Sequence, residues 1–339
     1  MKLFQPITLK DTTIRNRIVM APMCQYQADD DGFVQPWHLT HYTSRSIGGV
    51  GLIIVEATGI ERRGRLSGNC LGIYHDEHIE GLERIATWGR MNGAVMGIQL
   101  SHGGRKGHGD SLIGPSAISA DPQRYPVPQE LTDEGIDQLL MLWKEAAGRA
   151  REAGFDMIQL HGAHGYLLHS FLSPIANQRQ DQYGGSPENR RRLLMRVVQS
   201  VKEEWPDDRL LSVRLSAVDY VSGGLTLEDT SATVIALKEA GVDIIDISSG
   251  GIVPALIDAF PGYQVPLAQA VKAASSLPTI AVGRLDSLDL AESVVASGHA
   301  DFVALGRALL RDPHWVLRST EQLADVPWPE SYNRARRHS

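Results

Sequence analysis

Short apolar runs recur along the chain, and most of them are separated by longer segments with the amphipathic spacing of helices. The runs are rich in valine, isoleucine and leucine, and several are continuous rather than alternating. Continuous apolar runs of this length are typical of parallel strands covered on both faces. Eight such runs predict strands, at 17–20, 51–57, 95–100, 157–161, 211–215, 244–248, 279–282 and 302–305.

The segments between these runs place apolar residues at the three- and four-residue spacing of a helix. They cover 37–47, 77–92, 133–153, 187–204, 227–240, 265–275, 288–297 and roughly 313–323. Eight strands that alternate with about eight helices predict an α/β fold, a (β/α)8 TIM barrel. No linker rich in Pro, Ser or Gly divides the chain, so we expect 1–339 to form a single domain. Its longest irregular segment is 103–128, after the third strand.

The composition and net charge limit which kinds of molecule this protein is expected to bind. The chain has 339 residues, 42% hydrophobic and 22% charged, with a formal net charge of −7. Mixed signs with an acidic balance argue against nucleic acid or an anionic membrane surface as the main partner. The only cysteines are Cys24 and Cys70, which favours a reducing, cytoplasmic compartment. The first residues lack the apolar core of a signal peptide, and no apolar run is long enough to span a membrane.

Polar, glycine-rich and cationic groups follow the predicted strands, at the end where TIM barrels carry their active sites. The third strand runs into Ser101 to Lys106, and the sixth is followed by Ser249 and Gly250. The seventh and eighth strands are followed by Gly283-Arg284 and Gly306-Arg307. Loops in these last two places commonly bind phosphate, because glycines allow a close backbone approach and arginines add charge-assisted hydrogen bonds.

No dinucleotide-binding fingerprint or P-loop accompanies these loops. The expected phosphate therefore belongs to a ligand lying over the barrel mouth, and flavin mononucleotide (FMN) fits. Gln99 and Arg214, near the ends of the third and fifth strands, are then placed to contact the flavin ring edge. A cation there stabilises the negative charge of a reduced ring. Cys24, after the first strand with Tyr26 beside it, is placed to tune the ring electronics by hydrogen bonding.

The segment His161-Gly-Ala-His164-Gly-Tyr166 places two imidazoles and a phenol at the exit of the fourth strand. Three interpretations stay open for it. The histidines are structural, or they bind a metal such as zinc, or they donate hydrogen bonds to a substrate oxygen while Tyr166 supplies a proton. The sequence shows no nearby cysteine or acidic residue that clearly completes a metal site. The expected flavin favours the oxygen clamp.

Several of these segments together resemble the Old Yellow Enzyme family of flavin-dependent ene-reductases. The chain is most similar to the thermophilic-like branch of NADPH dehydrogenases and xenobiotic reductases. The resemblance extends from Leu3 to Pro313. Its most specific segments are Ala21 to Tyr26, Gly51 to Ala57, His161 to Tyr166, and the block from Leu172 to Arg190.

The resemblance implies that FMN binds non-covalently over the barrel. The positions implied to contact it are Ala21, Pro22, Met23, Cys24, Ala57, Gln99, Arg214, Gly306 and Arg307, with Ser249, Gly250 and Gly283 around its phosphate. The proposed phosphate contact of Arg284 rests on its charge alone. The resemblance also implies that His161 and His164 hold the substrate oxygen, that Tyr166 donates the proton, and that Tyr26 is a second substrate contact.

The C-terminal tail, 325–339, is also given a role by the resemblance. An arginine of the tail is implied to reach the site of a neighbouring subunit in a homodimer or homotetramer. Arg334 matches it by position, and Arg336 and Arg337 are rivals.

The predicted function is an FMN-dependent NAD(P)H:acceptor oxidoreductase. It reduces the activated C=C bond of a small enone, enal or nitroalkene in a ping-pong reaction. A metal-dependent barrel lyase or hydrolase and a non-catalytic FMN-binding protein are the alternatives. The sequence leaves open the choice of NADPH or NADH and the protonation state of His161 and His164.

Overall fold

Eight parallel strands form a closed barrel in the computed structural model, which describes residues 1–323 and 326–336. Their order around the barrel is β10-β11-β12-β3-β4-β5-β8-β9. The strands are β3 (Ile18–Met20), β4 (Leu52–Gly59), β5 (Val95–Ser101), β8 (Met157–Gly162), β9 (Leu210–Ser216), β10 (Ile244–Ser248), β11 (Thr279–Ala281) and β12 (Phe302–Leu305). Each overlaps a predicted strand, so the TIM barrel expected from the sequence is confirmed.

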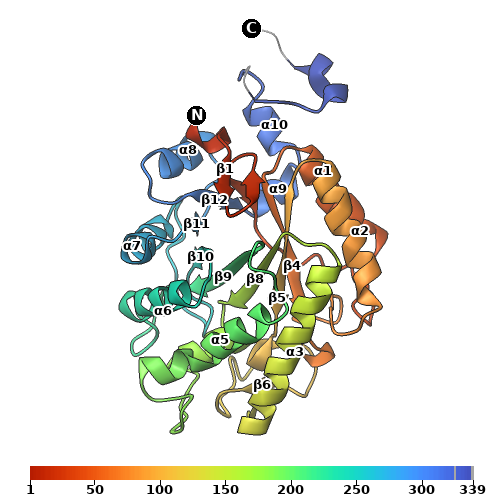
Figure 1. Ribbon diagram of the computed structural model, residues 1–339. Coiled ribbons are helices and arrows are strands. Elements are labelled where there is room, and N and C mark those ends of the chain that lie inside the picture. Colours follow the sequence, from red (N-terminus) through yellow and green to blue (C-terminus); the bar gives the residue numbers. More distant parts are fainter. Residues whose placement is uncertain (324–325, 337–339) are drawn as a thin grey trace.

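Helices surround these strands (Figure 1). They are α1 (Pro36–Ile47), α2 (His78–Met91), α3 (Asp133–Glu152), α5 (Pro187–Lys202), α6 (Leu227–Glu239), α7 (Val265–Ser275) and α8 (Leu288–Ala296). The short helices α4 (Leu167–Leu172) and α9 (Arg307–Arg311) were not predicted, and α10 (Trp315–Ser319) is shorter than the predicted 313–323. Thr320 Oγ1 donates to the carbonyls of Val316 and Leu317, 3.0 Å away in each case, which competes with continuation of the helix.

An antiparallel hairpin absent from the predicted elements precedes the barrel. It consists of β1 (Ile7–Leu9) and β2 (Thr12–Ile14). Its apolar side chains pack against the side chains that fill the barrel interior, among them Leu52, Met157 and Phe302. The segment 103–128 is mostly irregular, as expected. It contains the one-turn helix η3 (Gly104–Lys106) and the strand β6 (Ile113–Gly114), which pairs with β7 (Gln129–Glu130).

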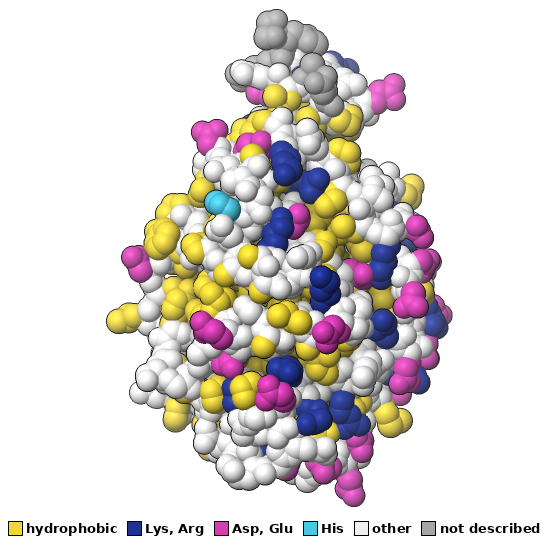
Figure 2. Space-filling view, turned by 60° about the vertical axis from the view of Figure 1, so that its left-hand side comes forward, with side chains coloured by type: hydrophobic (Ala, Val, Ile, Leu, Met, Phe, Trp, Pro, Cys, Tyr) yellow, Lys and Arg dark blue, Asp and Glu magenta, His cyan; other side chains and the backbone are white. Residues whose placement is uncertain are grey.

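The surface carries charges of both signs. Figure 2 shows basic and acidic side chains interspersed over one face, as the mixed signs along the sequence predict. In the part of the chain that is described, no helix combines the length and apolar character needed to cross a membrane.

The loops after β8 and β10 pack backbone against backbone. Gly165 has a φ of +77°, and a Cβ on it would lie 2.2 Å from the carbonyl oxygen of Gly251. A Cβ on Gly251 would in turn lie 2.7 Å from Cα of His164. Real Cβ atoms do not approach other atoms this closely, so both positions require glycine. This contact fixes where the His161 to Tyr166 segment lies relative to the loop that follows β10.

Substitution of Gly165 tests how tightly this contact is packed. Gly165→Ala should lower the free energy of unfolding by about 3 kcal/mol or more, because a positive φ and a backbone clash both oppose it. Gly185→Ala is the matched control. Gly185 has a φ of +76°, but a Cβ there meets nothing within 4 Å. Gly185→Ala should therefore lower the free energy of unfolding by only about 1 kcal/mol. Chemical denaturation measures both values, and equal losses would contradict the proposed packing.

Candidate active site

His161 is the last side chain of β8 before its terminal glycine, and it is buried, with 4% of its surface exposed. Its Nδ1 accepts a hydrogen bond from the backbone N–H of Ala163 at 3.3 Å. An imidazole nitrogen that accepts from a backbone N–H carries no proton. In the neutral ring the proton therefore lies on Nε2, which makes Nε2–H the donor that His161 offers.

His164 is oriented by two serines and by an unusual backbone conformation. Its φ is +59°, in the left-handed region that few residues other than glycine adopt. Its backbone N–H donates to Ser216 Oγ at 3.0 Å, and its ring Nε2 lies 2.8 Å from Ser248 Oγ. The two imidazoles meet edge to face, with 5.2 Å between ring centroids. Residues predicted to act together thus lie side by side.

Burial determines the protonation of both histidines. Desolvation, followed by the positive charge of Arg214, lowers the pKa of His161 and of His164 well below the ordinary histidine value. Both rings are therefore neutral at pH 7.

Tyr166 follows the histidine turn and immediately precedes α4. Its ring lies 4.9 Å from that of His161, centroid to centroid, in an edge-to-face contact. Burial raises the pKa of its phenol above the ordinary tyrosine value, so the hydroxyl keeps its proton at physiological pH.

Lys106 approaches the same group from η3. Its Nζ lies 5.2 Å from the centroid of the Tyr166 ring. It donates hydrogen bonds to the carbonyl oxygens of His164, at 2.7 Å, and Gly251, at 3.0 Å. Burial lowers the pKa of Lys106 to about 8. One ammonium group thus links the loops after β5, β8 and β10.

A cavity of 460 Å³ opens beside Arg214, at the C-terminal ends of the strands. Many residues predicted to contact FMN line it, namely Ala21, Pro22, Met23, Arg214, Gly283, Arg284, Gly306 and Arg307. Gly283 has a φ of +124°. Arg284 and Arg307 are exposed at its edge, and Arg284 donates a hydrogen bond to the carbonyl of Ala259. A phosphate contact by these two arginines stays a prediction.

Arg214 connects the cavity with the histidines. It pairs with His161 across β8 and β9, and with Asp246 across β9 and β10. Its Nε lies 3.3 Å from Asp246 Oδ2 but finds no hydrogen-bond partner among residues 1–323 and 326–336. A guanidinium that is 7% exposed and has an unused donor fits the acceptor edge of a flavin ring. The cavity and its glycines fit the rest of FMN.

The other predicted cofactor contacts surround this cavity without lining it. Ala57 and Gln99 are register partners on β4 and β5, and Gln99 Nε2 donates to Gln159 Oε1 at 2.8 Å. Ser249 and Gly250 follow β10, where Ser249 Oγ donates to Gln264 Oε1 at 2.8 Å. Cys24 is half-buried beside Glu56 and Cys70.

The remaining predicted substrate contacts lie at the periphery. Tyr26 has a φ of +55° and is 60% exposed. Arg334 lies in the tail helix η4 (Glu330–Ala335), which extends away from the barrel in Figure 1, and is exposed. Arg336 instead donates to the carbonyls of Glu321 and Leu323, which precede the tail in the same chain. Arg337 lies outside the described residues.

Sequence reasoning gave no role to several residues that shape the site. They are Lys106, Ser216, Ser248, Asp246 and Gln264. Two of these residues could have been identified as candidates from the sequence. Asp246 is a charged residue inside the apolar run of β10, and Lys106 ends the polar segment after β5. The serines gave no comparable signal, since a serine near a strand end is common.

Comparisons with known proteins identify the family of this chain. Residues 2–326 match the protein family described as NADH:flavin oxidoreductase / NADH oxidase. The NADPH dehydrogenase of Geobacillus thermodenitrificans (strain NG80-2) is 48% identical over 335 residues, which cover 98% of both chains.

Solved structures show the same relationship. The old yellow enzyme homologue from Zymomonas mobilis superimposes with a TM-score of 0.85 at 27% identity, over 100% of this chain and 97% of that one. A 2-naphthoyl-CoA reductase in complex with 2-naphthoyl-CoA gives 0.91 at 27% identity over 95% of this chain, which spans only 52% of that longer chain. The family predicted from the sequence is confirmed: this chain belongs to the NADH:flavin oxidoreductase / NADH oxidase family, as an FMN-dependent oxidoreductase of the Old Yellow Enzyme type.

Proposed function

We propose that this protein is an NADPH-dependent ene-reductase that reduces the activated C=C bond of α,β-unsaturated carbonyl or nitro compounds. The observation that carries the proposal is the cluster in which the neutral His161 ring contacts both the neutral His164 ring and the protonated phenol of Tyr166. His161 is also the register partner of Arg214, which lines the cavity proposed for FMN. When bound, FMN would supply the redox chemistry, which is hydride transfer from the nicotinamide to the alkene. NADPH and acceptor occupy the site in turn, which makes the kinetics ping-pong.

The acceptor oxygen is held by His161 and His164. His161 offers Nε2–H, because its Nδ1 is occupied by the Ala163 N–H. Ser248 Oγ, 2.8 Å from Nε2 of His164, fixes the orientation of the second ring. Neutral donors polarise a carbonyl or nitro oxygen as negative charge develops on it, and their fixed positions avoid the cost of reorganisation during the reaction.

The proton for the α-carbon comes from Tyr166 Oη. Its raised pKa keeps the hydroxyl protonated until the acceptor becomes basic enough to take the proton. The Lys106 ammonium, over the face of the same ring, opposes the negative charge that remains on the phenolate.

FMN would be held by the segment 21–24, by Ala57 and Gln99, and by Arg214 at the ring edge. The loops at Ser249 and Gly250, at Gly283 and Arg284, and at Gly306 and Arg307 would hold its phosphate. Arg214 is the cation of this set nearest the histidines, because it pairs with His161 in the barrel.

Tyr26 and the tail complete the substrate pocket. We propose that the exposed Arg334 extends into a second copy of this chain, in a homodimer or homotetramer. Arg336 is less suited to that contact, because it is hydrogen-bonded to the carbonyls of Glu321 and Leu323 in its own chain. The two cysteines are both free thiols, which supports a reducing cytoplasmic compartment.

An anaerobic two-step experiment tests the function. NADPH should bleach the flavin absorbance, and 2-cyclohexenone should restore it. His161→Ala and His164→Ala should each slow the restoration by about a hundredfold, as loss of a donor to a developing oxyanion does elsewhere. His299→Ala is the control, because His299 precedes β12 at the opposite end of the barrel. If NADPH bleaches the wild-type flavin but 2-cyclohexenone does not restore its absorbance, the protein binds reducible FMN without ene-reductase activity, and the proposal is contradicted.

Arg214→Lys tests the FMN contact while it retains the charge opposite Asp246. Loss of the guanidinium fork should weaken FMN binding by about 1.4 kcal/mol, roughly tenfold in Kd. Fluorescence titration of the apoprotein with FMN measures this Kd. Arg209→Lys, just before the start of β9, is the matched control. An unchanged Kd for Arg214→Lys would remove Arg214 from the cofactor site.

The pH dependence tests the assigned protonation states. Both histidines are already neutral, so the rate of flavin restoration by 2-cyclohexenone should show no inflection near about pH 6.5. It should fall as pH rises through the Lys106 pKa of about 8, because the ammonium beside Tyr166 is lost. Lys106→Met should be slower and flat over this range, whereas the exposed Lys144→Met should match the wild type. An inflection near 6.5 would contradict the neutral histidines.

A further inference from the structure

Two loops far apart in the sequence bring Cys24 and Cys70 together. Cys24 lies in the irregular segment after β3, and Cys70 follows the one-turn helix η2 (Arg62–Gly64). The backbone N–H of Ala28 donates to the carbonyl of Asn69, and Asn69 Nδ2 donates to the carbonyl of Ala28, both at 3.1 Å. Gly72 N–H donates to Gly32 O at 2.9 Å further along the same loops. These hydrogen bonds hold the two loops, and with them the two cysteines, next to each other.

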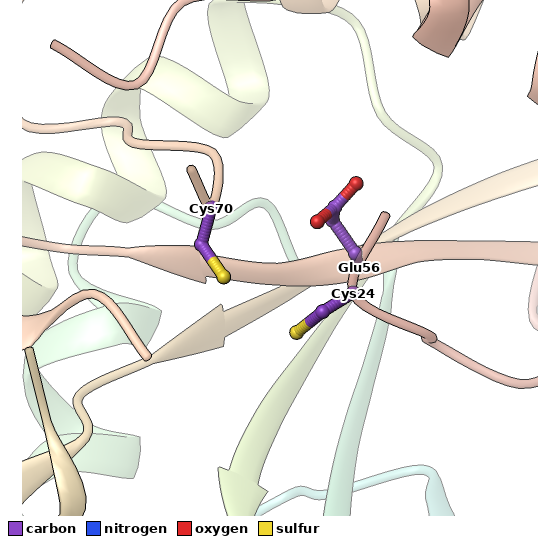
Figure 3. A group of neighbouring side chains, drawn as sticks. All are labelled: Cys24, Glu56 and Cys70. Carbon is purple, nitrogen blue, oxygen red and sulfur yellow. The ribbon is translucent and has the colours of Figure 1, made fainter. Parts of the chain in front are cut away.

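The two sulfurs face each other (Figure 3). Cys24 Sγ, Cys70 Sγ and a carboxylate oxygen of Glu56 lie within 4.8 Å of one another. Cys70 is fully buried at 0% exposure, whereas Cys24 is partly exposed. Ser67 Oγ lies 3.1 Å from Cys70 Sγ. Cys24 is therefore the less buried residue of the pair, and Cys70 has a polar partner in Ser67.

The pair shares a proton unequally. The hydrogen bond between the sulfurs raises the pKa of the Cys24 thiol and lowers that of the Cys70 thiol. The hydrogen bond with Ser67 also lowers the pKa of Cys70. A thiolate is the nucleophilic form of cysteine, so Cys70 is the sulfur prepared to attack.

A metal ion is a less suitable occupant, because the Glu56 carboxylate is already committed. Its Oε2 accepts from the backbone N–H of Gln25 at 2.9 Å, and its Oε1 accepts from Tyr42 OH at 3.3 Å. His38 Nε2 lies 3.5 Å from the same Oε1. The two sulfurs alone do not complete the four-ligand shell of a structural zinc site.

We propose that Cys24 and Cys70 are an oxidisable dithiol that hydrogen peroxide converts to an intramolecular disulfide. Peroxide reaches Cys24, which passes its proton to the Cys70 thiolate and then attacks one peroxide oxygen as a thiolate. The O–O bond breaks, the leaving hydroxide takes the proton back from Cys70, and water and a sulfenic acid result. Cys70 thiolate then attacks the Cys24 sulfur and displaces hydroxide. Two thiols are oxidised, and one peroxide is reduced to two waters once the hydroxide is protonated.

The disulfide requires the two sulfurs to approach to about 2.0 Å. Cys24 directly follows Met23, which lines the FMN cavity. Formation of the bond therefore draws the segment 21–24 toward the loop of Cys70 and away from its reduced position. The site responds to peroxide independently of which acceptor the enzyme reduces. Transient disulfides of this kind are the ones that reducing compartments use.

Thiol counting tests the proposal directly, because the chain has only two cysteines. The FMN-loaded enzyme is treated with hydrogen peroxide in the presence of a chelator, quenched and denatured. Titratable thiols should fall from two to none, and dithiothreitol should restore both. Intact mass should fall by two hydrogens, and trypsin should release residues 18–45 linked to residues 66–84. The flavin absorbance band should shift on oxidation of the wild type.

Cys70→Ser is the control, since it retains Cys24 alone. Its Cys24 should gain oxygen atoms rather than form a link, and its flavin band should not show the same shift. Two thiols that persist after peroxide, a Cys24 sulfinic acid beside a free Cys70, or a link between two chains on a non-reducing gel would each overturn the proposal. A disulfide that forms with an unchanged flavin band would overturn its connection to the cofactor cavity.

Discussion

The close contact between the loops after β8 and β10 is the constraint on which the rest of the site depends. Gly165 and Gly251 allow the two backbones to meet where no side chain fits. This contact holds His164 in a left-handed conformation that an unsupported histidine would rarely keep. Lys106 reinforces it with hydrogen bonds to a carbonyl of each loop. The direction in which the imidazoles present their donors follows from this packing of glycine on backbone.

Burial then determines which residues of the site are neutral donors and which carry positive charge. Desolvation keeps His161 and His164 neutral and Tyr166 protonated, so three groups in contact act as uncharged donors. Positive charge is supplied separately, by Arg214 on the side of the cavity and by Lys106 over the tyrosine ring. Arg214 is balanced by Asp246, which lies beside it on the next strand. Substrate activation and cofactor stabilisation thus use different residues of neighbouring strands.

The barrel was predictable because strands covered on both faces are continuous apolar runs, as at Leu52 to Val55 and Ile244 to Ile247. The hairpin β1–β2 was missed because each of its strands is only three residues long and contains at least one polar threonine, which leaves no continuous apolar run. The cluster at His161 was visible because three functional groups occur within six residues. The contacts of Lys106 and the pairing of Cys24 with Cys70 were not visible, because they join distant loops and depend on tertiary packing that no local sequence pattern records.

The central claim is that two neutral imidazoles hold the acceptor oxygen, and nitrogen NMR of the FMN-loaded enzyme tests it most directly. Protein labelled with 15N in histidine is titrated between about pH 5.5 and 8, a range that brackets the ordinary histidine pKa. Spectra of His161→Asn and His164→Asn assign the two rings. Our account predicts that both stay neutral throughout, with the His161 proton on Nε2. A titration midpoint near about 6.5, or a His161 proton on Nδ1, would contradict it.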